Sequence, residues 1–184
     1  MEKKPMQTKP SKTKGMRVTK IVLGVFFILF IGFLINQTSR TVSSPAVLRG
    51  GDIPLPSING GTLTLNQFAG KVMIVDFWAT WCPPCKKEIP AYKDLYRRYN
   101  EKGVEIIGIT LQSGTIDDVW AFAQEWEINY PVVMGNQEIV EAFGGISAFP
   151  TTFIINRKGE IVRKYVGYRP KEVFERDILE LLNE

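Results

Sequence analysis

The sequence predicts an α/β fold, a sandwich in which helices cover a mixed β-sheet. Three patterns carry this prediction: a short β-hairpin over residues 53–65, a strand–helix–strand unit over residues 72–110, and two strands followed by a helix over residues 151–182. The strand–helix–strand unit joins parallel strands and the last unit adds antiparallel ones, a combination typical of an α/β sandwich. With 184 residues, of which 45% are hydrophobic, the chain can form one domain of ordinary size plus a tail.

The N-terminal end is predicted to be a membrane anchor. Residues 1–20 contain seven lysines and arginines and one acidic residue, which predicts a basic cytoplasmic tail. The apolar run that follows has no charged residue before Arg40, so residues 21–39 are predicted to form one transmembrane signal anchor. Because basic flanks stay in the cytoplasm, we expect everything after Arg40 to lie outside it, at the cell membrane.

Two other interpretations of this segment stay open. A cleavable signal peptide with a long basic leader has a similar pattern, but no Ala-x-Ala site is present and Pro45 would follow a cut after Ser44. A buried core helix is disfavoured by the basic flank. Residues 40–52, rich in serine, proline and glycine, are predicted to be a linker, and residues 53–184 the folded domain.

The first half of the domain leads to one strand and one long helix. The hairpin turns at residues 59–61, and a helical turn or loop over residues 66–71 follows. The apolar run of residues 72–78 predicts a buried strand. Residues 83–99 predict a helix that begins with proline, which suits a first turn because its missing N–H needs no partner there.

The second half of the domain contains the remaining strands and helices. The expected elements are a buried strand at 104–110, a helix at 116–127, a short strand at 130–134, a short helix at 138–143, strands at 151–155 and 160–167 around a turn at 156–159, and an amphipathic helix that begins at Pro170.

The only two cysteines lie between the buried strand and the long helix. Cys82 and Cys85 are separated by two prolines, at the position where helix N–H groups and the positive end of the helix dipole converge. This environment stabilises a thiolate and lowers the pKa of the Cys82 thiol. A permanent structural disulfide is the alternative, but a closure of so few residues removes little unfolded-state entropy. The spacing therefore favours a redox pair.

The composition excludes several other classes of function. Histidine is absent, which excludes His-based triads and His-ligated metals, and two cysteines cannot make a structural zinc site alone. The formal charge of +4 comes from the basic tail, so the domain itself is mildly acidic. It therefore lacks the excess of basic residues that is typical of nucleic-acid binding. We expect no metal and no cofactor.

Residues 76–86 resemble the thioredoxin active-site stretch. The wider context is similar to the membrane-anchored, extracytoplasmic branch of that family represented by TlpA and ResA: an N-terminal anchor, Gly70-Lys71 before the strand, Lys86-Lys87-Glu88 after the second cysteine, and the segment 149–153, Phe-Pro-Thr-Thr-Phe. The resemblance covers residues 50–184. It implies a thioredoxin-like fold and a thiol–disulfide oxidoreductase.

The resemblance assigns roles to residues at the predicted site. Cys82, at the exposed tip of the helix, would be the attacking thiolate, and Cys85 the buried resolving thiol that closes the redox-active disulfide. Pro83 and Pro84 keep the loop between them stiff and uncharged. Trp81 is expected on the surface beside Cys82.

A peptide groove is expected beside the two sulfurs. The resemblance implies that Pro150 follows Phe149 through a cis peptide bond and packs against the sulfurs, and that Thr151 lines the same groove. An ordinary trans proline at the start of a strand is the alternative. We therefore predict substrate contacts from Trp81, both active-site prolines and residues 149–151.

Two carboxyls are candidates for proton transfer. Asp76 lies in an otherwise apolar strand, where burial should raise its pKa, and the thioredoxin resemblance links it to the proton of the buried thiol. Its alternative is a solvent-contacting carboxylate at the edge of the sheet. Glu88 lies one helical turn beyond Cys85, and ResA-like proteins have a glutamate there that influences cysteine acidity. Its alternative is an exposed helix glutamate.

The predicted function is reduction of disulfides in exported proteins outside the cytoplasmic membrane. The resemblance implies the haem-binding cysteines of apocytochrome c as one target, and a membrane electron donor of the CcdA or DsbD type. The same fold acting as an oxidant or isomerase is the nearest alternative, and a non-catalytic peptide-binding module is another. A peroxiredoxin is disfavoured because its Pro-x-x-x-Thr-x-x-Cys site is missing, and copper delivery because histidine is absent.

Overall fold

The computed structural model describes residue 48 and residues 50–184. The predicted tail at 1–20, the predicted anchor at 21–39 and most of the predicted linker at 40–52 lie outside the described residues. Within the part of the chain that is described, no helix is long and apolar enough to cross a membrane.

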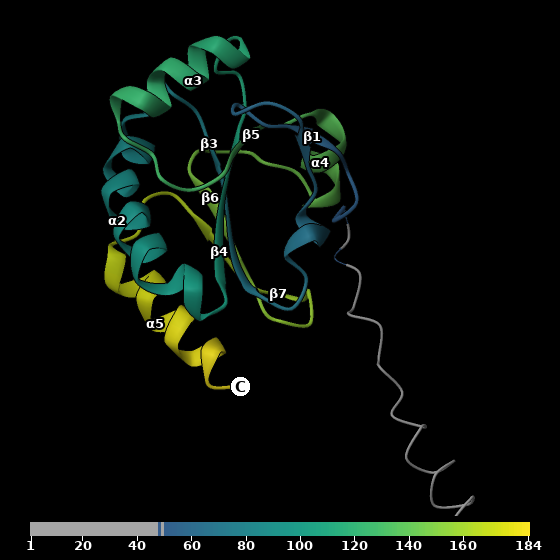
Figure 1. The fold of residues 1–184 in the computed structure, drawn as a ribbon, viewed down its shortest axis with the longest axis vertical. Helices are drawn as coiled ribbons and strands as arrows, with labels where there is room; N and C mark the ends of the chain where they lie inside the picture. The colour runs from purple at the N-terminus through teal and green to yellow at the C-terminus, as the bar shows by residue number, and fades with distance from the viewer. Residues whose placement is uncertain (1–47, 49) are drawn as a thin grey trace, which may run out of the picture. The chain divides into compact units, whose positions relative to one another are not determined.

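The domain is built on a five-stranded sheet with the order β5-β4-β3-β6-β7 (Figure 1). β3 pairs in parallel with β4 and antiparallel with β6, so the sheet is mixed, as predicted. A separate antiparallel pair, β1 with β2, forms the predicted hairpin. The strands are β1 Leu55–Pro56, β2 Thr62–Leu63, β3 Val72–Trp78, β4 Val104–Thr110, β5 Val132–Met134, β6 Thr151–Ile155 and β7 Ile161–Val166.

The helices follow the predicted order. The predicted bounds of the long helix are confirmed, but α3 ends two residues before its predicted end because Glu127 has a left-handed backbone (φ 50°) and the N–H of Ile128 turns back to the carbonyl of Ala123. The helical segments are η1 Leu65–Phe68, α2 Pro83–Tyr99, η2 Asn100–Lys102, α3 Ile116–Glu125, α4 Gln137–Ala142 and α5 Lys171–Leu182.

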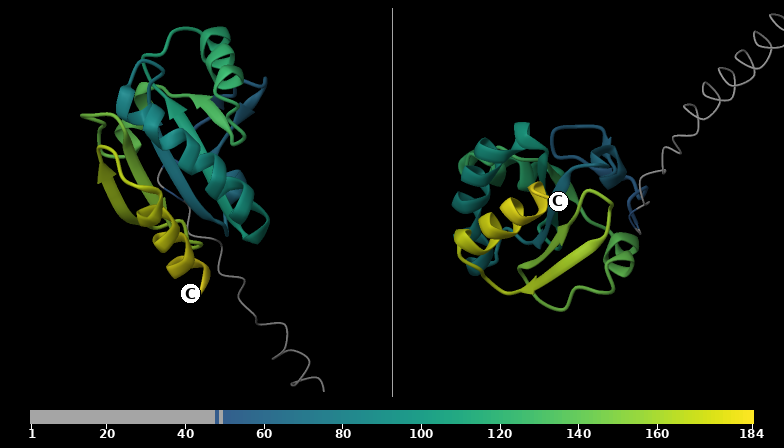
Figure 2. Two further views of the ribbon diagram at one scale, coloured as in Figure 1. Left: turned by 90° about the vertical axis from the view of Figure 1, so that its left-hand side faces the viewer. Right: turned by 90° about the horizontal axis from the view of Figure 1, so that it is seen from below.

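The sheet separates two apolar cores. Successive side chains of a strand point to opposite faces, and β3 shows this alternation. Ile74 and Trp78 pack with α2, α3 and α5, whereas Met73, Val75 and Phe77 pack with the hairpin and α4. Figure 2 shows α2 and α5 side by side on one face of the sheet, with α4 on the other. By the same alternation, Asp76 points toward α2.

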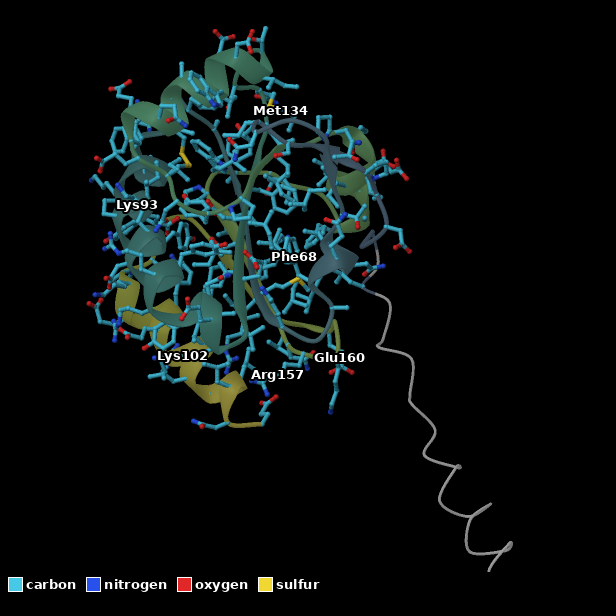
Figure 3. The ribbon with its side chains drawn as sticks, viewed as in Figure 1. Phe68, Lys93, Lys102, Met134, Arg157 and Glu160 are labelled. Atoms are coloured by element: carbon cyan, nitrogen blue, oxygen red, sulfur yellow. A yellow bond between two sulfur atoms is a disulfide. The ribbon has the colours of Figure 1, made fainter. Side chains whose placement is uncertain are left out.

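The candidate site lies at the end of the sheet where the parallel strands finish. Met134, the last residue of β5, marks this end in Figure 3, and the turn that contains Arg157 and Glu160 lies at the opposite end. Ligands of α/β proteins bind outside the carboxyl ends of such strands. Cys82 follows the end of β3 by four residues and is therefore at this end.

Candidate active site

The centre of the site is a disulfide at the start of α2. Cys82 and Cys85 are joined by an S–S bond of 2.08 Å, with their Cα atoms 5.3 Å apart. Cys82 is the N-cap residue, and its Sγ accepts the backbone N–H of Cys85 at 3.3 Å. Because Pro83 and Pro84 have no N–H, this is the first donor that the helix offers. The same N–H and the helix dipole stabilise negative charge on the Cys82 sulfur.

Both cysteines are covered, which corrects the expectation that Cys82 lies exposed at the helix tip. Cys82 is only 3% exposed and Cys85 only 2%. The two cysteines differ in their access to a substrate: Cys82 lines a groove of about 420 Å³, whereas Cys85 does not line it. A substrate in this groove therefore meets the Cys82 sulfur first.

The groove beside Cys82 is uncharged and has both polar and apolar surface. None of the described residues that line it carries a charge, and Trp81 forms one wall. Trp81 is 57% exposed, its ring meets Phe149 edge to face at 5.8 Å, and its indole N–H donates to the carbonyl of Gln112 at 2.8 Å. The lining residues are Trp81, Cys82, Pro83, Pro84, Gln112, Ile146, Ser147, Ala148 and Phe149.

The Phe149–Pro150 peptide bond is cis, as the resemblance implies. Pro150 and Thr151 are buried and do not line the groove, so the predicted groove contacts of these two residues are not found, whereas Phe149 does line it. The Thr151 hydroxyl instead donates to the carbonyl of Ala148 at 2.7 Å. This bond holds Ala148, which lines the groove together with Ile146, Ser147 and Phe149.

A loop after β4 holds the segment that precedes Cys82, and the sequence did not indicate it. The Ser113 hydroxyl accepts the backbone N–H of Thr80 at 3.1 Å and the hydroxyl of Thr110 at 2.6 Å. Beside it, Gln112 adopts a left-handed backbone (φ 53°) and accepts the Trp81 indole N–H. In the sequence, the dipeptide Ser113-Gly114 at the end of this loop was the only indication of a tight turn.

Asp76 is buried in the middle of the sheet. It is 4% exposed, and β3 is a central strand, so the alternative of a solvent-contacting edge carboxylate is wrong. Its Oδ1 accepts the hydroxyl of Thr152 at 3.0 Å. Burial raises the pKa of Asp76 well above its usual value, and repulsion from Glu88 raises it further.

Glu88 is buried on the face of α2 that packs against the sheet. It is 0% exposed, so the alternative of an exposed helix glutamate is wrong. Its Oε1 accepts the backbone N–H of Arg169 at 2.7 Å, and its Oε2 faces the Tyr92 hydroxyl at 3.4 Å. Burial raises the pKa of Glu88 to about 7.

Two residues that the sequence analysis missed join these carboxyls. The Tyr92 hydroxyl lies 3.1 Å from the Thr152 hydroxyl, which donates to Asp76. Tyr92 is four residues after Glu88, so its place on the same helical face was readable from spacing. Nothing in the sequence distinguished Thr152 from its neighbour Thr151 as a residue of the site.

Known proteins of similar sequence are thiol-disulfide oxidoreductases. The AhpC/TSA family profile matches residues 50–164. A thiol-disulfide oxidoreductase ResA from Bacillus anthracis is 30% identical, over 82% of this chain and 84% of the relative. A ResA from Geobacillus kaustophilus is 29% identical, over 86% of this chain and 88% of the relative.

Solved structures resemble the fold as well. A thioredoxin-family thiol:disulfide interchange protein from Chlorobium tepidum superposes with a TM-score of 0.68 at 30% identity, covering 76% of this chain and 98% of that one. StoA from Bacillus subtilis gives 0.59 at 26% identity, covering 68% of this chain and 94% of that one.

A Cys-x-x-Cys disulfide at a helix start, which shares a groove with the residue before a cis-proline on a thioredoxin-like sheet, defines a thiol–disulfide oxidoreductase. The chain belongs to the AhpC/TSA family, and its relatives make it an oxidoreductase of the ResA type. The interpretation as a non-catalytic peptide-binding module is therefore set aside.

The Trp81 wall gives a first prediction. Trp81→Ala should raise KM for a disulfide-bonded model peptide about fivefold with little change in kcat, because an aromatic contact of this kind contributes about 1 kcal/mol. The matched control is Trp120→Ala, which removes a tryptophan of similar exposure (47%) that does not line the groove. Equal KM values for the two variants would contradict a substrate-binding role for Trp81.

Proposed function

We propose that this protein is a membrane-anchored reductant of disulfides in exported proteins. The observation that carries the proposal is the placement of the two sulfurs: Cys82 faces the groove and Cys85 lies behind it. That asymmetry suits a reaction in which one thiol attacks and the other resolves. The basic tail at residues 1–20 and the anchor at 21–39 support a location in the cell membrane, with the cytoplasm on the tail side.

The reaction consists of two thiol–disulfide exchanges. The Cys82 thiolate attacks one sulfur of the target disulfide, which forms a mixed disulfide and releases the target's other sulfur as a thiolate. The Cys85 thiol then loses its proton and attacks the Cys82 sulfur. This step closes the Cys82–Cys85 disulfide and frees the reduced target. Two electrons have then passed from the protein to its target.

The carboxyls beneath the site serve the second exchange. Cys85 is buried, so its proton cannot pass directly to bulk water. Glu88 lies one helical turn away with a pKa of about 7, which suits a group that accepts and returns a proton near neutral pH. Asp76, with its pKa raised by burial, is the second acceptor.

The groove and the anchor support particular partners. An uncharged groove of about 420 Å³ suits an extended, weakly charged peptide around the target cysteine. Apocytochrome c, with its haem-binding cysteines, is one exported protein of this class. Thiols outside the cytoplasm tend toward disulfides, so the protein needs a continuous supply of electrons. We propose a membrane donor of the CcdA or DsbD type, which an anchored domain meets in the plane of the membrane.

Equilibration of the Cys82–Cys85 pair with glutathione tests the direction of electron flow. A reductant should have a potential toward that of thioredoxin, about −270 mV, because its dithiol must give up electrons readily. The measurement is the fraction of disulfide at a series of glutathione ratios. A potential near about −120 mV would instead assign the protein to the oxidants.

A further inference from the structure

Three hydrogen-bond contacts form an unbroken chain between the two buried carboxyls. Thr152 Oγ1 lies 3.0 Å from Asp76 Oδ1, Tyr92 Oη lies 3.1 Å from Thr152 Oγ1, and Glu88 Oε2 lies 3.4 Å from Tyr92 Oη. The chain joins β3, β6 and α2. All four residues are buried, so no link is open to competition from bulk water.

The number of protons in this chain is fixed by its chemistry. Three links need three protons, but the Thr152 and Tyr92 hydroxyls supply only one each. If both carboxyls are ionised, each hydroxyl donates outward, and the two hydroxyl oxygens face each other at 3.1 Å without a proton between them. One proton on either Asp76 or Glu88 completes the chain. The other oxygen of Glu88 already accepts the Arg169 N–H, which leaves Oε2 to carry the proton.

We propose that Asp76 and Glu88 hold one proton between them and that Tyr92 and Thr152 are the positioning residues that pass it from one carboxyl to the other. When the two hydroxyls rotate together, a proton that was on Asp76 appears on Glu88, and the negative charge moves the opposite way. The pair then acts as one acid–base group rather than two. This inference rests on the function proposed above, because it describes how the same site handles its proton.

The surroundings of the pair favour a single negative charge. Among the residues that the structure describes, the titratable groups that face the pair are Tyr92 on α2, Tyr130 before β5 and Arg169 after β7. Only the last is cationic, and its backbone N–H, not its guanidinium, contacts Glu88. Burial raises the pKa of both carboxyls, which agrees with one of them staying protonated at neutral pH.

The chain gives the resolving step a proton acceptor at either end. With one shared proton the pair has one carboxylate, which takes the proton of the Cys85 thiol and becomes neutral. The thiolate so formed attacks Cys82 and closes the disulfide. The target leaves Cys82 as a thiolate and takes up the extra proton from the pair. Protons balance in each step, and no further reactant is needed.

The test is to titrate the two carboxyl groups in the oxidised full-length protein and to monitor their signals by ¹³C NMR. In the wild type, both carboxyl signals should respond to the same two pH midpoints, because coupled sites titrate as a pair. Tyr92→Phe keeps the ring and removes the central hydroxyl, so it should shift at least one midpoint by about half a unit or more. Thr152→Val, which breaks the adjoining links, should give the same change, and the double variant no more than either alone.

Tyr130→Phe is the matched control. Its ring packs edge to face on Tyr92 at 6.0 Å, and it faces both carboxyls, but it is not a link in the chain. Its titration curves should match those of the wild type. If Tyr92→Phe and Tyr130→Phe give the same curves, coupling is through space alone and the relay is overturned. The proposed function survives that outcome if the Tyr92→Phe protein still reduces disulfides; it fails only if the wild type does not.

Discussion

Replacing Cys82 with alanine is expected to lower the turnover of disulfide reduction at least about a thousandfold, because no other group can form the mixed disulfide. Cys82 lines the groove and Cys85 does not, so Cys85 cannot take over the attack. The measurement is steady-state reduction of a disulfide-bonded model peptide by the full-length protein with excess small-molecule reductant.

The fold should survive this substitution. A disulfide that closes so short a loop contributes little through unfolded-state entropy, so the variant should keep the near-UV circular dichroism of the wild type. Residues that act as one unit are strongly non-additive, and the Cys82→Ala, Cys85→Ala double variant should therefore be no slower than Cys82→Ala alone. A single variant that retains a tenth or more of wild-type turnover would contradict the assignment of Cys82 as the nucleophile.

Glu88→Gln is expected to make the protein more stable than the wild type at alkaline pH. The pKa of Glu88 is about 7 in the folded state and 4.5 ordinarily, so burial favours its protonated form. Its contribution to stability is therefore complete below about pH 4.5 and is lost as the pH rises through 7. At about 1.4 kcal/mol per pKa unit, the wild type should lose roughly 3 kcal/mol that glutamine does not lose. Urea unfolding at several pH values measures this difference.

Asp94→Asn provides a control of opposite sign. A hydrogen bond from Lys171 holds the pKa of Asp94 below its usual value, so its contribution is already complete above about pH 4. The difference between this variant and the wild type should stay constant from pH 5 to 8. Because the sequence has no histidine, no imidazole titrates in that window to obscure the result. A stability difference for Glu88→Gln that does not change with pH would contradict a buried, protonated Glu88.

The helices and strands could be predicted from the sequence where a recognisable pattern ran through the whole element. Residues 72–78 are an almost unbroken apolar run, and residues 83–99 begin at proline, so both elements have their predicted bounds. The end of α3 was missed because it depends on the left-handed backbone at Glu127, an unusual conformation for a residue that is not glycine.

The part of the site that is formed by residues close together in the sequence could be predicted; the part that depends on distant residues could not. The burial of Cys82 depends on residues 146–149, more than sixty residues away, whose position follows from the pairing of β6 with β3. That register also decides between the two threonines of β6. A slip of one residue would exchange their faces, and the register that sets Thr152 opposite Asp76 is not written in the local sequence. This is why Thr151 was assigned to the groove and Thr152 was overlooked.

The order of attack of the two cysteines can be read from the mass of the covalent adduct that each single-cysteine variant forms. When a disulfide-bonded model peptide is mixed with the reduced Cys85→Ala protein, a stable mixed disulfide should form through Cys82, with the mass of protein plus peptide. The Cys82→Ala protein under the same conditions should form none, because its remaining sulfur lies behind the groove. An adduct on the Cys82→Ala protein together with none on the Cys85→Ala protein would contradict the order of attack and the account built on it.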